Sequence, residues 1–200
     1  MKIIMHPNVI RALNFATAAH GSINQKRKYT GEDYIWHPVG CAKILIKHVK
    51  DVTIEDVMAM LLHDTIEDVN GEVRPDLRIY SEDVHEEFGF QVGHRVDGLT
   101  DVSKLSDGNR AIRKEIDRQH TLAQPFYVKN CKLADVYHNH FSMLRASGPF
   151  ELKWMKEKAA LVNDSRMNDC DPHFLAFVRN AVNSAIVKIS NNLDKRHNNA

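Results

Sequence analysis

The sequence has few cysteines and no long apolar run, and each of these absences excludes a class of protein. Its three cysteines, Cys41, Cys131 and Cys170, lie far apart, and no CxxC pair occurs. We therefore expect neither a disulfide framework nor a cysteine-rich zinc site, and we expect a reducing, cytoplasmic location. No segment approaches the roughly 20 apolar residues of a membrane span. The opening "MKIIMHPNVI" is interrupted too early by polar residues and proline to be a signal peptide.

The net charge is also close to zero, because the sequence contains 27 basic and 26 acidic residues. Such a chain has no overall field to recruit nucleic acid or an anionic membrane, so we expect neither partner. A local cluster of charges can still bind a small anionic substrate. The composition leaves the oligomeric state open.

Strand patterns are absent, whereas helical periodicity recurs along the chain. We expect Asn8 to cap the first helix, Pro38 to open the second, and Thr53 to form a capping box with Asp56. No repeat, low-complexity tract or linker interrupts the pattern. The fold class is therefore predicted as all-α, a single helical-bundle domain over residues 1–190 with a flexible tail at 191–200. The expected helices cover about 7–20, 38–50, 54–68, 81–89, 90–100, 109–123, 126–146, 150–163 and 172–190.

The segment "LLHDTIEDVN" places a histidine and three carboxylates at the end of an apolar helix. On a continuous helix, residues four apart share a face, so Glu67 would lie over His63 and Asp68 over Asp64. Unpaired carboxylates beside a core are costly to desolvate and require a positive partner. A divalent metal ion is the simplest such partner.

Two other segments supply further donors of the same kind. His37 stands directly before Pro38 at a helix entrance, and Asp135 lies four residues before Asn139 on an otherwise apolar helix. Together with His63 and Asp64, His37 and Asp135 would offer two nitrogen and two oxygen ligands. This mixture suits manganese, iron or zinc. Because no sulfur ligand pair is available, the site is predicted to be catalytic rather than structural.

Each of these residues also has a plain structural interpretation. His37 can simply cap its helix, His63 and Asp64 can form a surface pair, and Asp135 can pair with Lys132 one turn earlier. The occurrence of all three segments in one chain favours the metal site. His138 and His140 are rival ligands beside Asp135. Five other histidines are expected to be ordinary core or surface residues: His20, His48, His85, His94 and His120.

These motifs resemble the HD-domain metal-dependent phosphohydrolases, which are named for the adjacent His-Asp. Within them the chain is similar to the hydrolase domain of the RelA/SpoT homologue alarmone enzymes, particularly the small alarmone hydrolases and the metazoan SpoT homologue. The resemblance extends over most of the chain. It rests on "AAHGSINQKRKYTGEDYIWHPVGCAKIL", "LLHDTIEDV", "EEFGFQVGHRVDGLTDVSKL", "KLADVYHN" and "LKWMKEKAALV".

The resemblance implies His37, His63, Asp64 and Asp135 as metal ligands, with manganese as the expected ion and other divalent metals as alternatives. It implies no ligand role for His138. It assigns the catalytic pair that orients and activates the attacking water to Glu67 and Asp68. Their plain alternative is a solvated helix end. However, two acids at a helix C-terminus oppose the helix dipole, so local stability does not explain them.

The resemblance also implies nucleotide contacts from Arg27 and Lys28 in the basic loop and from Asn139, with Ser142 as a weaker candidate. Tyr34 either stacks on a base or packs as a buried aromatic. The chain departs from the family pattern in three places. An extra residue lies between Arg27 and Gly31, Asp33 stands where members usually have proline, and Val136 replaces an arginine.

The resemblance implies hydrolysis of the 3′-pyrophosphate of guanosine tetra- or pentaphosphate, giving GDP or GTP and pyrophosphate. The chain lacks room for the family's synthetase and regulatory domains, so only degradation is expected. The alternatives are another nucleotide phosphohydrolase, acting on NADPH 2′-phosphate or nucleoside 5′-phosphates, and a non-enzymatic nucleotide-binding module. The last predicts loss of ligands or of the Glu-Asp pair, and the sequence retains both.

Overall fold

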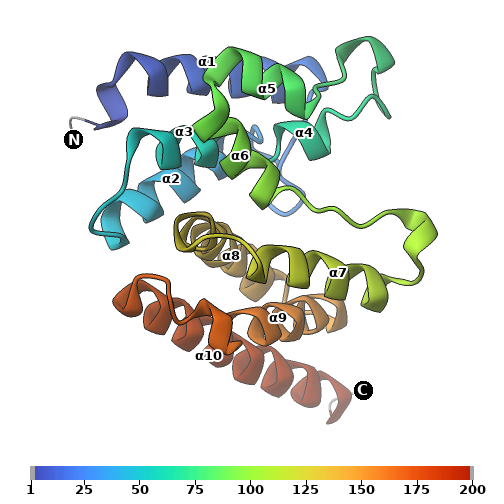
Figure 1. Ribbon diagram of the computed structural model, residues 1–200. Helices are drawn as coiled ribbons and strands as arrows, with labels where there is room; N and C mark the ends of the chain where they lie inside the picture. The colour runs from blue at the N-terminus through green and yellow to red at the C-terminus, as the bar shows by residue number, and fades with distance from the viewer. Residues whose placement is uncertain (1–2, 199–200) are drawn as a thin grey trace.

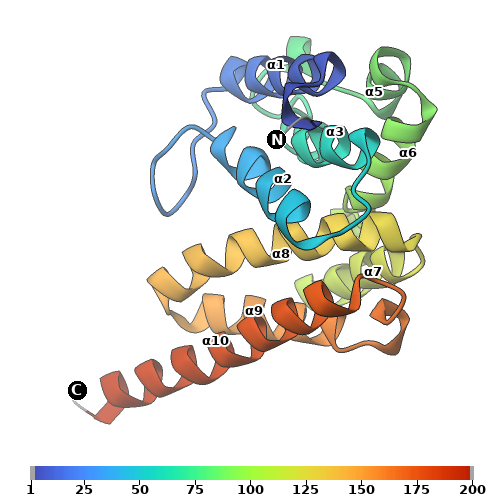
Figure 2. The same ribbon diagram turned by 90° about the vertical axis from the view of Figure 1, so that its left-hand side faces the viewer.

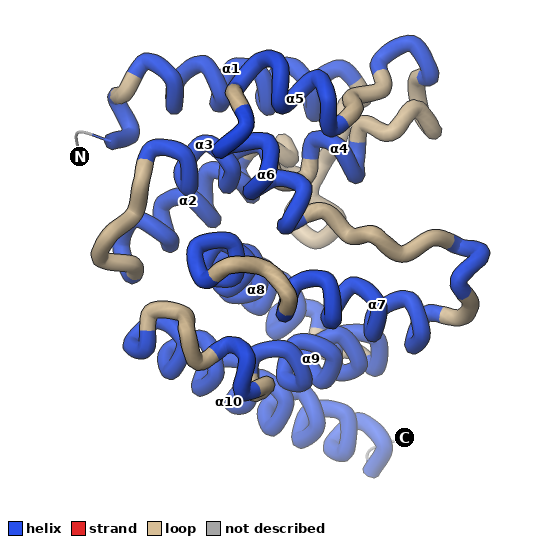
Figure 3. The backbone as a smooth tube through the Cα atoms, in the orientation of Figure 1, coloured by secondary structure: helices blue, strands red, loops and turns tan. Residues whose placement is uncertain are grey.

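The computed structural model describes residues 3–198, and within that range it contains helices and loops but no strand (Figure 1, Figure 3). The described range also holds four short 3-10 turns, of which one precedes the first helix and three lie between longer helices. Among these described residues, no helix combines the length and the apolarity that crossing a membrane would need. The α-helices are α1 (Pro7–Ser22), α2 (Trp36–His48), α3 (Ile54–Leu62), α4 (Thr65–Asp68), α5 (Ser81–Phe88), α6 (Phe90–Leu99), α7 (Arg110–Leu122), α8 (Phe126–Ala146), α9 (Pro149–Val162) and α10 (Pro172–Asn198).

Helix α8 forms the middle of the bundle. Helices α1 to α6 lie above it, and of these α2, α3 and α6 pack against it, whereas α9 and α10 pack against it from below (Figure 1, Figure 2). Every residue from Val128 to Val136 on α8 is buried, and so is every residue from Asp56 to Leu62 on α3. A helix that is buried around its whole circumference belongs to the centre of a domain. The all-α fold predicted from the sequence is therefore confirmed.

The capping box at the start of α3 is confirmed. Thr53 Oγ1 accepts from the Asp56 amide at 3.1 Å, and Asp56 Oδ2 accepts from the Thr53 amide at 3.0 Å. Asp56 also receives a hydrogen bond from the buried Arg95 guanidinium at 2.8 Å. The sequence pattern therefore located the beginning of this central helix correctly.

The continuous helix expected over 54–68 is wrong at one point, because α3 ends at Leu62 and α4 begins at Thr65. Side chains occupy the carbonyls that the next helical turn would use. His63 Nδ1 donates to the Met60 carbonyl at 2.9 Å, and Thr65 Oγ1 donates to the Leu62 carbonyl at 2.7 Å. The break places His63 and Asp64 at a corner, so they do not lie along one straight helical face.

Three other boundaries differ from the expectation. The first helix is capped by His6, whose Nδ1 accepts from the Asn8 amide at 3.3 Å, so Asn8 is not the cap. Helix α2 begins at Trp36, with Pro38 in its first turn, where a missing amide costs no hydrogen bond. Helix α10 continues through residues 191–198, most of the expected tail, and residues 199–200 lie outside the described range.

Candidate active site and metal centre

The four predicted metal ligands converge where α2, α3 and α8 meet. Nε2 of His37 lies 3.3 Å from Asp135 Oδ1 and 3.5 Å from Asp64 Oδ2. Nε2 of His63 lies 3.1 Å from Asp64 Oδ2 and 3.9 Å from Asp135 Oδ1. Two imidazole nitrogens and two carboxylates from three distant segments therefore face one small volume.

His63 is oriented by its own backbone. Because Nδ1 binds the Met60 carbonyl, Nε2 faces the carboxylates. The side chain is fully buried, and among the described residues Nε2 makes no hydrogen bond despite its closeness to Asp64. Burial lowers the pKa of His63, but Asp64 outweighs that effect and raises it to about 9. Without a metal, this raised pKa keeps a proton on Nε2, and a divalent cation could take the place of that proton between the imidazole and the two carboxylates.

His37 is held from behind by His138, whose Nδ1 lies 2.9 Å from His37 Nδ1. With that bond in place, His37 presents Nε2 to the cluster, as a metal-binding imidazole requires. Burial and the neighbouring His37 lower the pKa of His138 to about 4, so His138 is neutral. Its Nδ1 can therefore accept a hydrogen bond from the Nδ1–H group of His37. The rival histidines thus lie elsewhere: His138 stands behind His37, and His140 bonds the Tyr137 carbonyl.

Gly40 makes the contact between His138 and α2 possible. A Cβ atom on Gly40 would overlap Nε2 and Cδ2 of the His138 ring. The sequence "HPVG" therefore supplies both the proposed ligand and the space for the residue that orients it. Neither Gly40 nor the role of His138 was predicted from the sequence.

Cys41 is a further member of the cluster that the sequence pattern did not predict. One ligand atom each from His37, Cys41, His63 and Asp135 lies within 4.8 Å of the others. Burial, reinforced by Asp135 and Asp64, raises the pKa of the Cys41 thiol well above its usual value. Asp64 suits the fourth position by geometry, because its Oδ2 lies 3.1 Å from His63 Nε2 and 3.5 Å from His37 Nε2. The spacing His37–Cys41, four residues on one helix, was the available signal.

The charge balance of the cluster also fits a divalent ion. Burial alone would raise the pKa of Asp135, but Lys132, with Nζ 3.4 Å from Asp135 Oδ2, helps hold it well below its usual value. Asp64 has a lowered pKa as well, because His63 and His37 outweigh its burial. Two ionised carboxylates therefore face two imidazoles. These residues fit a divalent metal, and the cluster can hold one.

Glu67 and Asp68 lie beside this cluster, each held by a different partner. Glu67 Oε1 accepts from the Asp101 amide at 2.6 Å, and Asp68 Oδ2 accepts from Gln25 Nε2 at 2.9 Å. Burial, with Asp101 next, raises the pKa of Glu67 to about 7. Burial and Asp64 raise the pKa of Asp68 to about 6. Both carboxyls can therefore exchange protons near neutral pH, which suits a general base.

The sequence pattern did not indicate that His20 helps to position Asp68. His20 is buried, and its Nδ1 lies 2.7 Å from Gln25 Oε1, so His20 orients the amide that binds Asp68. Tyr34 is partly buried and lines the polar cavity at the cluster, and its ring packs against His20 and Arg27. Its hydroxyl donates to Asp64 Oδ2 at 2.7 Å, and burial and Asp64 raise its pKa, so it remains protonated.

A polar cavity of about 160 Å³ opens onto the cluster. Its walls include His37, Asp64, Glu67 and Asp135. They also carry a group of basic side chains that the sequence pattern did not single out as substrate contacts. This cation wall consists of Arg110, Lys114, Lys132 and Lys158.

The four residues predicted to contact substrate divide into two groups. Arg27 Nη2 donates to Asn139 Oδ1 at 2.8 Å and lies 3.5 Å from Ser142 Oγ, while Asn139 Nδ2 donates to Asp135 Oδ1 at 2.7 Å. Arg27, Asn139 and Ser142 therefore form one chain that ends at the metal cluster. Lys28 does not join them, because it is exposed and its ammonium lies over the Tyr29 and Phe150 rings.

Comparison with known proteins adds a decisive observation. The family model described as "HD domain" matches residues 12–144. This chain belongs to the HD-domain family. The matched segment runs from α1 to α8 and contains all four proposed ligands together with Glu67 and Asp68.

Several relatives of this HD domain have names that specify an activity. It is 37% identical over 136 residues to a probable GTP pyrophosphokinase of Mycobacterium leprae (strain TN), covering 68% of this chain and 16% of that protein. It is 33% identical over 132 residues to the guanosine-3′,5′-bis(diphosphate) 3′-pyrophosphohydrolase MESH1 of Danio rerio, covering 66% of each. The aligned segment thus makes up only about a sixth of the Mycobacterium leprae protein.

A solved structure confirms the architecture of the HD domain. It is titled "A metazoan ortholog of SpoT hydrolyzes ppGpp and plays a role in starvation responses", and it superposes with a TM-score of 0.73 at 19% identity. The superposition covers 92% of this chain and 96% of that one. The two chains therefore share one fold over nearly their whole lengths.

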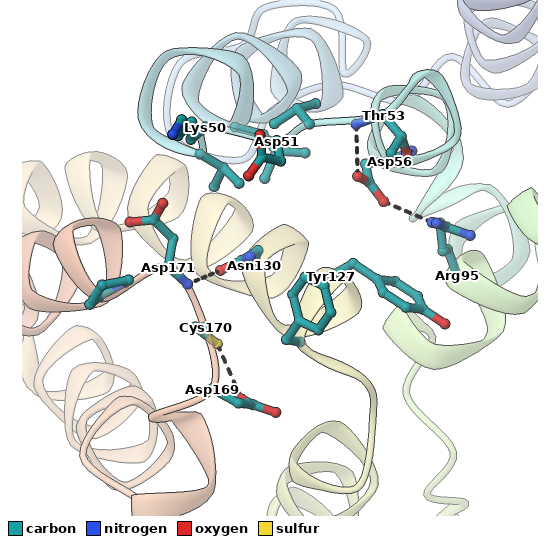
Figure 4. Close-up of a pocket in the computed structure, with 15 residues that line it drawn as sticks. Lys50, Asp51, Thr53, Asp56, Arg95, Tyr127, Asn130, Asp169, Cys170 and Asp171 are labelled. Carbon is teal, nitrogen blue, oxygen red and sulfur yellow. Dashed lines mark hydrogen bonds and ion pairs between the residues drawn. The ribbon is translucent and has the colours of Figure 1, made fainter.

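The HD domain also has a larger cavity, of about 310 Å³, at the opposite ends of α2, α3 and α8 (Figure 4). The surface that this cavity exposes is mostly apolar, although polar side chains also line it. No histidine is among its lining residues in the described part of the chain. Asp56 is already paired with Arg95, and Asp171 Oδ1 accepts two amides at the start of α10. We therefore place the chemistry in the smaller cavity, where donors and titratable groups converge.

Proposed function

We propose that this HD domain hydrolyses the 3′-pyrophosphate of guanosine tetra- and pentaphosphate, giving GDP or GTP and pyrophosphate. The observation that carries the proposal is the junction of the metal cluster with a cation wall inside one small polar cavity. A metal centre beside positively charged side chains suits the hydrolysis of a phosphorylated substrate. The similarity to the Danio rerio pyrophosphohydrolase supports this choice of substrate, because the aligned segment covers 66% of each protein.

In this proposal His37, His63, Asp64 and Asp135 hold one divalent ion, for which we propose manganese. When bound, such an ion polarises a phosphoryl oxygen and lowers the pKa of water by several units. Glu67, assisted by Asp68, takes the proton of the attacking water. The water oxygen bonds to the phosphorus attached to the ribose, and the bond to the 3′ oxygen breaks. That oxygen takes up a proton from solvent, and Glu67 releases the proton it accepted to solvent.

The chain's remaining polar groups position the substrate. We propose that Arg27, Asn139 and Ser142 contact the nucleotide, because they are linked to one another and to Asp135. Lys28 could reach the same space only after leaving the aromatic rings on which it rests. We propose residues 1–190 as the hydrolase domain. We also propose a cytoplasmic location, because all three cysteines are buried and unpaired.

A substrate panel tests the proposal. The purified protein with manganese should convert guanosine tetraphosphate to GDP and pyrophosphate, and it should leave the 5′-diphosphate intact. NADPH and nucleoside 5′-phosphates are the comparison substrates, and His63→Ala is the inactive control. Faster release of phosphate from NADPH under equal conditions would replace the proposed substrate. Nucleotide binding without any turnover would favour a binding module.

A further inference from the structure

Lys158 differs from the other three members of the cation wall. Arg110 donates to both carboxylate oxygens of Glu157, at 3.0 and 2.8 Å. Lys132 faces Asp135 at 3.4 Å. Lys114 forms ion pairs with Asp101 and Asp117. These three cations are therefore already neutralised by carboxylates of the protein.

Within residues 3–198, no carboxylate lies at salt-bridge distance from the Lys158 ammonium, which rests 5.3 Å from the Trp154 ring centre. Lys158 is partly buried and lines the cavity together with Glu67 and Asp135. Burial and the neighbouring Lys132 lower its pKa. An ammonium that is partly withdrawn from water without a partner is unfavourable, and a cation–π contact recovers only part of that cost.

Lys158 also lies apart from the residues proposed to contact the nucleotide. Along α8, Lys132 lies one turn before Asp135, whereas Asn139 lies one turn after it. Arg27 and Ser142 gather at the Asn139 end. Lys158 instead lines both the main cavity and a small recess behind it, in each case beside Lys114 and Lys132.

We propose that Lys158 binds the terminal phosphate of the 3′-pyrophosphate group and thereby selects substrates that carry a diphosphate at this position. This inference rests on the proposed function. The anion would supply the partner that Lys158 lacks. Lys114 stands beside it as a second, already neutralised donor.

Lys158→Met tests the proposal, with Lys156→Met as the matched control, because Lys156 is exposed on the same helix. Both variants are compared with the unmodified, manganese-loaded protein by calorimetric titration with inorganic pyrophosphate and, separately, with GDP. Hydrogen bonds to charged groups are worth about 1.5–3 kcal/mol, so pyrophosphate should bind Lys158→Met at least about tenfold more weakly. GDP affinity should stay within about twofold, and Lys156→Met should change neither affinity.

Thermal unfolding gives a second readout that needs no ligand. Removing an unpaired, partly buried charge should leave the midpoint of Lys158→Met unchanged or raise it, whereas loss of an ordinary ion pair would lower it. Unchanged pyrophosphate affinity, or a loss confined to GDP, would overturn the proposal. Pyrophosphate binding is measured independently of turnover. Absence of guanosine tetraphosphate hydrolysis would therefore refute the proposed function without deciding the role of Lys158.

Discussion

Glu67→Gln separates proton transfer from every other property of the site. Glu67 Oε1 accepts the Asp101 amide at 2.6 Å, and the glutamine carbonyl can accept the same bond. Neither the proposed ligands nor the Gln25 bond to Asp68 involves the Glu67 side chain. The variant should therefore keep its metal and its geometry, and it should lose only the ability to take up a proton.

The expected loss of activity follows from that single change. General acid–base catalysis is typically worth about 10²–10⁴-fold, or about 3–5 kcal/mol of transition-state stabilisation. Asp68, whose pKa is raised to about 6, is a second base within the same motif. The loss of kcat in Glu67→Gln should therefore lie near the lower end of this range. The loss in the double variant that carries both Glu67→Gln and Asp68→Asn should lie near the upper end.

The same substitution should stabilise the metal-free protein above neutral pH. A carboxyl whose pKa rises from 4.5 to about 7 on folding costs the folded state about 3 kcal/mol once it is ionised. That cost is fully present above pH 7 and disappears below pH 4.5. Glu67→Gln should accordingly exceed the unmodified protein in stability by up to about 3 kcal/mol at pH 8, and it should lose this advantage at pH 4.5.

The assays are kcat, bound metal and urea unfolding in chelator at the two pH values. Glu72→Gln is the matched control, because Glu72 is exposed in the loop after α4. Near-normal turnover in the metal-loaded double variant would refute the catalytic role of the pair. Lost metal in Glu67→Gln would show instead that Glu67 supports the ligands.

Three further substitutions test the surroundings of the site. His63→Ala should strip the metal and abolish turnover, and full occupancy by elemental analysis would exclude His63 as a ligand. Gly40→Ala should displace His138 from His37 and weaken metal binding about 10–100-fold in a titration, whereas Gly21→Ala, with open space around it, should not. Asp56→Ala removes a cap and the partner of buried Arg95, so urea unfolding should show a loss of about 3–5 kcal/mol, and a loss below about 1 kcal/mol would contradict this.

The sequence predicted most helices, and it singled out the four proposed ligands that the structure brings close together. His63 and Asp64 end an apolar run, and Asp135 interrupts another, so polar groups stood out against buried helices. The break between α3 and α4 was not predicted. It depends on His63 and Thr65 bonding backbone carbonyls, and a helical wheel does not represent such bonds.

The cation wall escaped prediction for a different reason. Arg110 and Lys114 lie on α7 and Lys158 on α9, in segments that look like ordinary charged surface helices. Only the packing of these helices against α8 turns their side chains toward one cavity. Likewise, the contact between His138 and His37 joins residues on two helices, and nothing in either local pattern indicates it.

The match to the HD-domain family ends at residue 144, before α9 begins. The proposed hydrolytic residues thus all belong to the shared part of the chain, whereas Trp154, Glu157 and Lys158 lie outside it. If Lys158 binds the terminal phosphate as proposed, that contact is encoded outside the shared segment, whereas the proposed nucleotide contacts Arg27, Asn139 and Ser142 lie within it. Substitutions at Lys158 therefore offer a way to change the preference for a terminal phosphate without altering any of the proposed ligands or the Glu67–Asp68 pair.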